Sequence, residues 1–215
     1  MSQFPIWASP GEASDMMFDV RQPGVTGLGY ALLRPRSKKG QERSVGQDRS
    51  MSRLAYAKMN PIKPGPTSAR TRCGMQTTAR DYRLLLAPGV ADPMSLNKLL
   101  ADYDEAVPEH QRLLAAVLTL PFKRDEPLHD QFDKATTWAM LHLARARQLT
   151  SLAVLHAPGD QLCLENPHAH LVVFGRIHQV CGWGAVHPDL TESAHGAWAE
   201  RWLDFCEAWC RKPEV

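Results

Sequence analysis

The chain has 215 residues, of which 44% are hydrophobic and 22% charged, and these values are ordinary for a globular protein with a core of its own. No apolar run is long enough to cross a bilayer, and the N-terminus lacks the basic and apolar regions of a secretory signal. Five irregularly spaced cysteines predict free thiols. We therefore expect a cytoplasmic protein with no membrane partner.

The net charge of +2 conceals a strong asymmetry along the chain. Residues 34–83 hold 13 Lys and Arg against 3 Asp and Glu, a balance of +10. The rest of the chain holds 12 bases against 20 acids, a balance of −8. Such a basic segment is typical of a surface that binds a polyanion and also of a solvated linker, and composition alone leaves both open.

The first half of the chain carries weak patterns. Residues 1–50 mix Pro, Gly, Ser and charged residues without a sustained period, and we expect a poorly structured, disordered basic extension there, followed by one domain over residues 51–215. A short β-like run follows at Arg53–Met59. The pattern of Met75–Leu86 predicts a helix, and residues 95–104 predict another, with the first residue, a serine, as its N-cap.

The second half carries clearer patterns. A continuous apolar run at Arg112–Leu120 predicts a buried strand. Apolar residues recur at helical spacing over Pro127–Gln148, which predicts an amphipathic helix. Two further strands are predicted at Ser151–Ala157 and His168–Phe174, and a Trp-rich amphipathic helix at Ala194–Cys210 whose aromatic stripe we interpret as core.

Three histidines stand at the ends of the two later strands. His168 and His170 are two residues apart on one strand, so both side chains point to the same face. His156 ends the preceding strand, and antiparallel pairing would bring it beside the other two. Three neutral imidazoles can hold a divalent cation and leave positions open for a substrate oxygen. A packing role for the pair is the alternative to this predicted metal site.

The residues around the pair resemble the three-histidine motif of MobA/MobL-type relaxases, which are HUH endonucleases of plasmid mobilisation. The matching residues are Glu165-Asn166-Pro167-His168-Ala169-His170, preceded by Leu155-His156-Ala157. The upstream order of strand, helix and strand ending in His is similar too. The resemblance spans residues 53–210 and is most specific over 150–175. It implies an α+β fold in which helices flank a central antiparallel sheet.

The resemblance also implies an activity, which is metal-dependent nicking and strand transfer of single-stranded DNA at a transfer origin, with relaxosome accessory proteins as further partners. Mg²⁺ or Mn²⁺ at His156, His168 and His170 would polarise the scissile phosphate, and a tyrosine would attack it to leave a 5′-phosphotyrosyl enzyme. Two other interpretations stay open. One is a non-catalytic DNA-binding or accessory protein on a degenerate relaxase fold, and the other is an unrelated metal-binding α+β domain.

The family places its nucleophile on a helix after the first strand. Leu54-Ala55-Tyr56 resembles that strand, so Tyr82, on the helix expected next, fits the order best. Tyr56 and Tyr30 are the alternatives, with a structural role expected for Tyr56. Because tyrosine ionises near pH ~10 in water, its hydroxyl needs the cation or a basic neighbour to become a nucleophile.

Arginines near Tyr82 are the predicted DNA contacts. A helix would place Arg83 on the same side as Tyr82, where it could hold the phosphate under attack. The full predicted set is Arg70, Arg72, Arg80 and Arg83. The family tends to support a metal-binding histidine with an acid on the strand at 113–120. That strand is apolar here, so we expect such support to be missing or to come from elsewhere.

Overall fold

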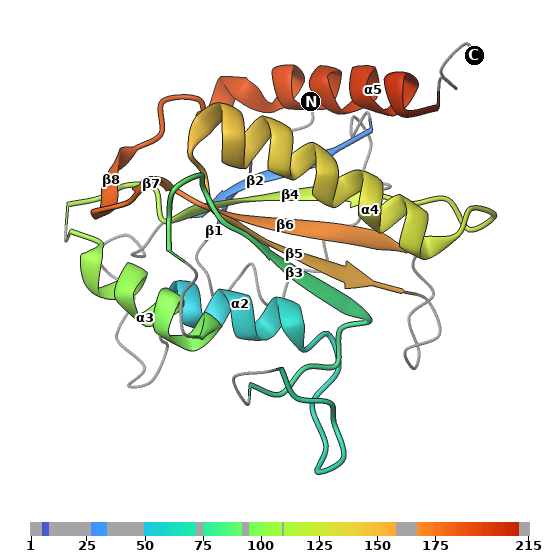
Figure 1. Cartoon of the computed structure of the whole chain (residues 1–215), viewed down its shortest axis with the longest axis horizontal. Helices are drawn as coiled ribbons and strands as arrows, with labels where there is room; N and C mark the ends of the chain where they lie inside the picture. Colours follow the sequence, from blue (N-terminus) through green and yellow to red (C-terminus); the bar gives the residue numbers. More distant parts are fainter. Residues whose placement is uncertain are drawn as a thin grey trace.

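The computed structural model describes residues 6–8, 27–33, 50–71, 75–91, 95–108, 110–157 and 167–210. These residues form three layers, with a β-sheet between two pairs of helices (Figure 1). This is the predicted α+β architecture. Within the described ranges, no helix is both long enough and apolar enough to span a bilayer.

The main sheet has the spatial strand order β1, β2, β4, β6, β5, β3. The strands are β1 (Ile6–Ala8), β2 (Gly29–Leu33), β3 (Asp81–Leu85), β4 (Ala115–Pro121), β5 (Ser151–His156) and β6 (His168–Phe174). β1 runs parallel to β2, and the five strands from β2 to β3 pair antiparallel. The inner strands β4 and β6 are buried almost throughout because helices cover both faces of the sheet.

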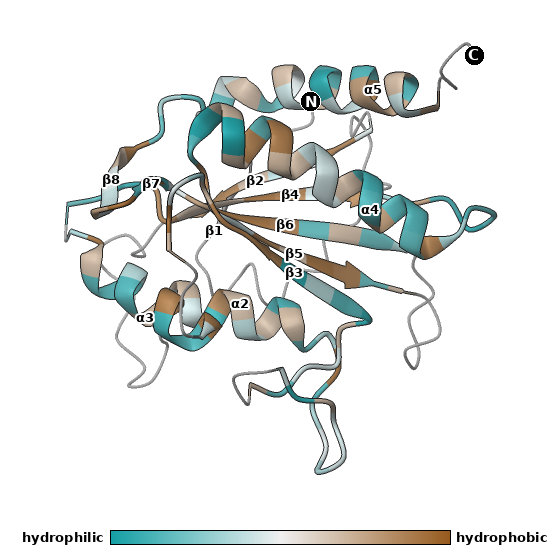
Figure 2. Cartoon of the chain, viewed as in Figure 1, coloured by the Kyte–Doolittle hydropathy of each residue, from teal (hydrophilic) through white to brown (hydrophobic). Residues whose placement is uncertain are grey.

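One face of the sheet is covered by α4 (Leu128–Ala139) and α5 (His195–Cys210) (Figure 1). α4 continues into a π-helical turn, Met140–Arg145. Trp138 of α4 contacts Trp198 and Trp202 of α5 edge to face, with ring centroids 6.1 and 5.7 Å apart. The predicted aromatic stripe is therefore core. Figure 2 shows mainly hydrophobic residues on the inner strands, between helices that carry both hydrophobic and hydrophilic residues.

The opposite face is covered by α2 (Met51–Met59) and α3 (Leu96–Ala106). The two helices are joined at their ends, where the Asp104 carboxylate accepts hydrogen bonds from the backbone N–H groups of Met51 and Ser52 at 2.6 and 3.1 Å and from the Ser52 hydroxyl at 2.6 Å. These bonds satisfy donors that a helix N-terminus leaves free. α2 is thereby fixed over the sheet, with its C-terminal end beside β5.

The expectation for residues 1–50 is wrong where the structure describes them. Gly29–Leu33 forms β2, a fully buried strand between β1 and β4. Its five residues are too few to show a period, and only pairing with β4, nearly 90 residues later, makes them a strand. The remainder of the expected extension, residues 1–5, 9–26 and 34–49, lies outside the described residues.

Two further predictions for the first half are wrong. Arg53–Met59 belongs to the helix α2 rather than a strand, since Leu, Ala, Lys and Met favour helices and the Ser50 hydroxyl caps its first turn. Met75–Leu86 contains the edge strand β3 rather than a helix. Pairing with β5 supplies its backbone hydrogen bonds, and this tertiary contact overrides the local propensity.

The other predicted elements are confirmed with small shifts of their ends, and the Ser95 hydroxyl caps α3 by accepting from Lys98 N at 3.1 Å. A hairpin that the sequence did not predict, β7 (Arg176–Gln179) and β8 (Gly182–Val186), follows the main sheet. Arg176 holds it through hydrogen bonds to the carbonyls of Gly184, Trp183 and Ala106. A short 3-10 turn, Glu192–Ala194, leads into α5.

Candidate metal centre

The three histidines lie at one end of the sheet, where β5 ends and β6 begins (Figure 1). His156 stands opposite His168, and His170 stands opposite Val154. All three share the face covered by α2 and α3, because Val154 and Val172, at alternate positions of the same strands, pack in that core. The prediction that these histidines lie together on adjacent antiparallel strands is confirmed.

The three rings converge closely enough to share one ion. Their centroids lie 4.7 to 5.1 Å apart, and one nitrogen from each lies within 4.8 Å of the others. Nε2 of His168 and Nε2 of His170 are 3.2 Å apart. Two imidazole nitrogens on one cation, each bonded at ~2.0–2.1 Å and about 90–110° apart, would be separated by about 2.8–3.4 Å. The spacing of this pair therefore fits a shared cation.

Burial keeps the imidazoles in the form that binds metals. His168 and His170 are 5% and 2% exposed. Burial, together with the neighbouring His168, lowers the pKa of His156 to about 3. Burial, followed by the charge of Lys58, holds the pKa of His170 well below its usual value. Both rings are therefore neutral at physiological pH, which is the form in which an imidazole binds a cation.

The chemistry of the donors narrows the choice of ion. The group offers nitrogen ligands from three imidazoles, which suit divalent transition metals. Mg²⁺ prefers oxygen ligands, and oxygens would have to come from water or substrate at the open positions. Three protein ligands leave such positions free. The residues fit a divalent cation, and they fit a transition-metal ion better than Mg²⁺.

Two groups from other elements hold the rings. Nε2 of His156 lies 2.7 Å from the carbonyl oxygen of Lys58, near the C-terminal end of α2. Nδ1 of His170 lies 3.0 Å from the hydroxyl of Thr119 on β4. The β4 strand therefore supports a histidine after all, through a hydroxyl rather than an acid. Sequence reasoning missed Thr119, and its one signal was a lone hydroxyl in an apolar run.

Tyr82 lies on the same side of the sheet as the histidines. It pairs with Val154, which in turn pairs with His170, so the three form a row across β3, β5 and β6. Two strand spacings of ~4.8 Å put the Cα atoms of Tyr82 and His170 roughly 10 Å apart. The expected helix around Tyr82 is a strand, but the side chain is half-buried on the face of the candidate centre.

The other three tyrosines differ in their burial and in their place in the fold. Tyr30 is 1% exposed and packs in the core on the opposite face of the sheet. Tyr103 is fully buried and donates to the carbonyl of Leu114 at 2.5 Å, which is a structural role. Tyr56 lies on α2 rather than on a strand and is 42% exposed, two residues before Lys58. Its predicted structural role has no support in this position.

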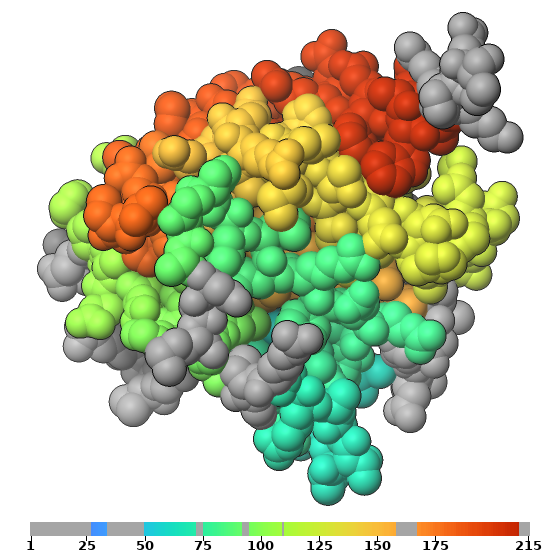
Figure 3. Space-filling view, viewed as in Figure 1, coloured from blue at the N-terminus to red at the C-terminus, as the bar shows by residue number. Residues whose placement is uncertain are grey.

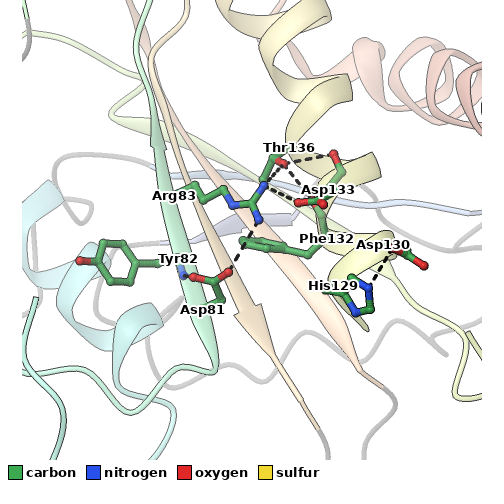
Figure 4. A network of polar contacts seen from close by, with 8 residues as sticks. All are labelled: Asp81, Tyr82, Arg83, His129, Asp130, Phe132, Asp133 and Thr136. Atoms are coloured by element: carbon green, nitrogen blue, oxygen red, sulfur yellow. Dashed lines mark hydrogen bonds and ion pairs between the residues drawn. The ribbon is translucent and has the colours of Figure 1, made fainter. Parts of the chain in front are cut away.

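Arg83 points away from Tyr82, to the other side of β3 (Figure 4). It forms an ion pair with Asp133 at 2.6 Å, donates to the Thr136 hydroxyl at 3.1 Å and lies over the Phe132 ring. Neighbouring residues of a strand face opposite sides. The expectation that Arg83 holds the phosphate attacked by Tyr82 is therefore wrong.

The other predicted arginines lie on the segment between α2 and β3. Arg80 is exposed, and its backbone N–H donates to the carbonyl of Leu155, next to His156. Arg70 is also exposed, at a β-bridge with Gln76. Arg72 lies outside the described residues.

Comparisons with known proteins show similarity at the level of the fold. No protein-family model and no curated protein matches the sequence. A solved structure from work on the molecular basis of vancomycin-resistance transfer in Staphylococcus aureus has a similar fold, with a TM-score of 0.50. The two chains are 15% identical, over 59% of this chain and 67% of the other. Fold and site together define an α+β protein with a three-histidine candidate metal centre at the end of its sheet.

Proposed function

We propose that the protein nicks and transfers single-stranded DNA at a transfer origin, in the manner of a MobA/MobL-type relaxase. The observation that carries this proposal is the convergence of three histidines at the end of the sheet, on the same face as Tyr82. The similarity in fold to a protein studied for resistance transfer supports the same setting. Relaxosome accessory proteins are the further partners that such a role implies.

The reaction is a transesterification. His156, His168 and His170 would hold the cation, Mn²⁺ or Mg²⁺, which when bound withdraws charge from the non-bridging oxygens of the scissile phosphate. A tyrosine hydroxyl attacks the phosphorus and loses its proton to solvent, while the bond to the 3′ oxygen breaks and that oxygen takes up a proton from solvent. The products are a 5′-phosphotyrosyl enzyme and a free 3′-OH. Attack by a 3′-OH reverses the step and rejoins the strand.

Tyr82 remains the proposed nucleophile because it shares a face and a cross-strand row with His170. Tyr56 is the second candidate, and the observation in its favour is exposure. Its side chain is 42% exposed on α2, whose Lys58 carbonyl contacts His156. Tyr30 and Tyr103 are buried, which withdraws their hydroxyls from a DNA substrate.

The segment between α2 and β3 is the proposed DNA contact. Residues 60–80 carry Lys63, Arg70, Arg72 and Arg80 and no Asp or Glu. In the space-filling view the described residues of this segment form a projection from the body of the molecule (Figure 3). Its two ends are fixed beside His156, where Ala79 N donates to the Met59 carbonyl and Arg80 N to the Leu155 carbonyl. A phosphate backbone following this segment would reach the histidines.

The test is incubation of the protein with single-stranded oligonucleotides and Mn²⁺ or Mg²⁺, followed by denaturing electrophoresis for a covalent protein–DNA adduct. We expect an adduct that disappears in His170→Ala and in Tyr82→Phe, and persists in the buried-tyrosine control Tyr30→Phe. Loss in Tyr56→Phe with persistence in Tyr82→Phe would move the nucleophile to α2.

DNA binding without any adduct would support the alternative, a non-catalytic DNA-binding or accessory protein on this fold. The observation that favours it is a hydroxyl, Thr119, at the position where an acid would support a histidine. Metal binding without affinity for single-stranded DNA would instead indicate an unrelated metal protein.

A further inference from the structure

We infer that the Lys58 carbonyl fixes the tautomer of His156 and that the Thr119 hydroxyl orients the ring of His170, so that the cation is held by Nδ1 of His156 and by Nε2 of His168 and His170. Thr119 is thereby a positioning residue of the centre. This inference rests on the proposed function for the presence of a cation. It adds which nitrogen atoms bind the ion and which residue orients them.

The contact at His156 determines which of its ring nitrogens carries the proton. A backbone carbonyl oxygen only accepts hydrogen bonds, so the 2.7 Å contact requires a proton on Nε2 of His156. A neutral imidazole carries one N–H, and the other nitrogen, Nδ1, then holds the lone pair. The Lys58 carbonyl lies near the C-terminal end of α2, where helix carbonyls lack partners within the helix. His156 therefore satisfies α2 while turning its other nitrogen into a ligand.

At His170 the ligand is the other ring nitrogen, Nε2, whereas at His156 it is Nδ1. Nδ1 of His170 and the Thr119 hydroxyl are 3.0 Å apart, and both residues are at most 2% exposed. Nε2 of His170 faces Nε2 of His168 at 3.2 Å, the spacing of two ligands on one cation. If Nε2 binds the ion, Nδ1 carries the proton and Thr119 accepts it. A partner of this kind on the distal nitrogen fixes ring orientation and increases ligand basicity.

The chain contains a matched control for this contact. The Thr150 hydroxyl lies 2.8 Å from Nδ1 of His178, and both residues are buried. Thr150 and Thr119 are thus both buried threonines, each hydrogen-bonded to the Nδ1 atom of a histidine, and only Thr119 touches the candidate centre. Thr→Val removes the hydroxyl and keeps the shape at either position, and β-branched Val suits a strand.

The first measurement is Mn²⁺ affinity, from the electron paramagnetic resonance signal of free Mn²⁺, for the full-length protein and three variants. We expect Thr119→Val to bind Mn²⁺ about 10–100-fold more weakly, and Thr119→Ser and Thr150→Val to bind within about threefold of the unmodified protein. Equal affinity of Thr119→Val and the unmodified protein would overturn the role of Thr119 and leave the proposed function standing. Absence of Mn²⁺ binding by the unmodified protein would overturn the cation site and both proposals.

The second measurement is made on the unmodified protein and needs no Thr119 variant. Long-range ¹H–¹⁵N spectra of the metal-free protein with ¹⁵N-labelled histidine report which ring nitrogen bears the proton. We expect Nε2–H for His156 and Nδ1–H for His170, with signals assigned by single His→Asn substitutions. The reverse tautomer at either ring would overturn the inference, whether or not the protein cuts DNA.

Discussion

The histidines of this protein differ in their hydrogen-bond partners and in their exposure. His156 and His170 are each bound at one nitrogen by a group on another element, so each ring is oriented before any ion arrives. His129 is 79% exposed and contacts only the adjacent Asp130 among the contacts described for it. Substitution of His170 should therefore affect the candidate metal centre, and substitution of the exposed His129 serves as a control.

Cation binding should stabilise the fold only when the three-histidine group is intact. A ligand at 100 times its dissociation constant raises the free energy of unfolding by about 2.7 kcal/mol. We expect saturating Mn²⁺ to raise the thermal midpoint of the unmodified protein and of His129→Ala, and to leave His170→Ala unchanged. Differential scanning fluorimetry with and without EDTA measures this. A full shift in His170→Ala would place the ion elsewhere.

Burial of His178 makes the folding free energy depend on pH. Its pKa is lowered by burial, so below pH ~6.5 the unfolded chain takes up a proton that the folded chain does not. The free energy of unfolding should therefore fall as the pH drops below that value. In urea titrations at pH 7.5 and 5.5 we expect His178→Asn to lose less stability on acidification than the unmodified protein. The same loss in both proteins would mean that His178 has the same pKa in the folded and the unfolded chain.

At the scale of elements, the edge strand β3 presents functionally different side chains on its two faces. Tyr82 faces the candidate centre, while Arg83 binds Asp133 and Thr136 of α4 on the opposite side (Figure 4). Alternation along the strand separates a side chain available to substrate from one that fastens the strand to a helix. The strand thus positions the candidate nucleophile through a contact that lies on the far side of the sheet.

Arg80, just before β3, and Arg83, within it, should therefore behave differently. The Arg83 and Asp133 side chains are 41% and 50% exposed, so their ion pair contributes at most about 1 kcal/mol. We expect Arg83→Met to lower the free energy of unfolding by that amount with little change in affinity for single-stranded DNA. Arg80→Met should weaken DNA binding and leave stability unchanged. Fluorescence anisotropy measures the DNA affinity of both variants, and urea denaturation measures their stability. Weaker DNA binding by Arg83→Met, with unchanged binding by Arg80→Met, would make Arg83 a DNA contact.

At the scale of the whole molecule, the described part of the basic segment falls on elements near the candidate centre. The basic segment 34–83 includes α2, the projecting residues 60–80 and most of β3. Truncation is a poor test of its role, because removal of residues 1–50 would also delete β1 and the buried strand β2. Charge substitution on exposed positions leaves the sheet intact.

Neutralising the projecting segment should weaken the dependence of DNA affinity on salt. Each phosphate contact to single-stranded DNA contributes about 0.7 to the slope of log affinity against log salt. We expect Lys63→Gln, Arg70→Gln and Arg80→Gln together to reduce that slope by about 2. A triple variant at exposed bases of the helices, Lys98→Gln, Arg145→Gln and Arg201→Gln, is the control. Equal slopes in the two triple variants would show that binding is not localised to residues 60–80.

The sequence by itself determined the three histidines and most elements of the second half of the fold, namely β4, α4, β5, β6 and α5, but not the hairpin β7–β8. Strand and helix periods there are long enough to be recognised locally, and the spacing of His168 and His170 places both on one face whatever surrounds them. The end of the preceding strand supplied His156 by the same local rule. These features depend on residues that are close in the chain.

Only the tertiary structure decided β2, the strand character of β3 and the support of the histidines. β2 and β3 are short, and they exist as strands because β4 and β5 pair with them. Thr119 reaches a histidine 51 residues away, and Lys58 reaches one 98 residues away. No local pattern encodes contacts over such separations, because they arise when strands and helices pack together and each buried polar group must find a partner.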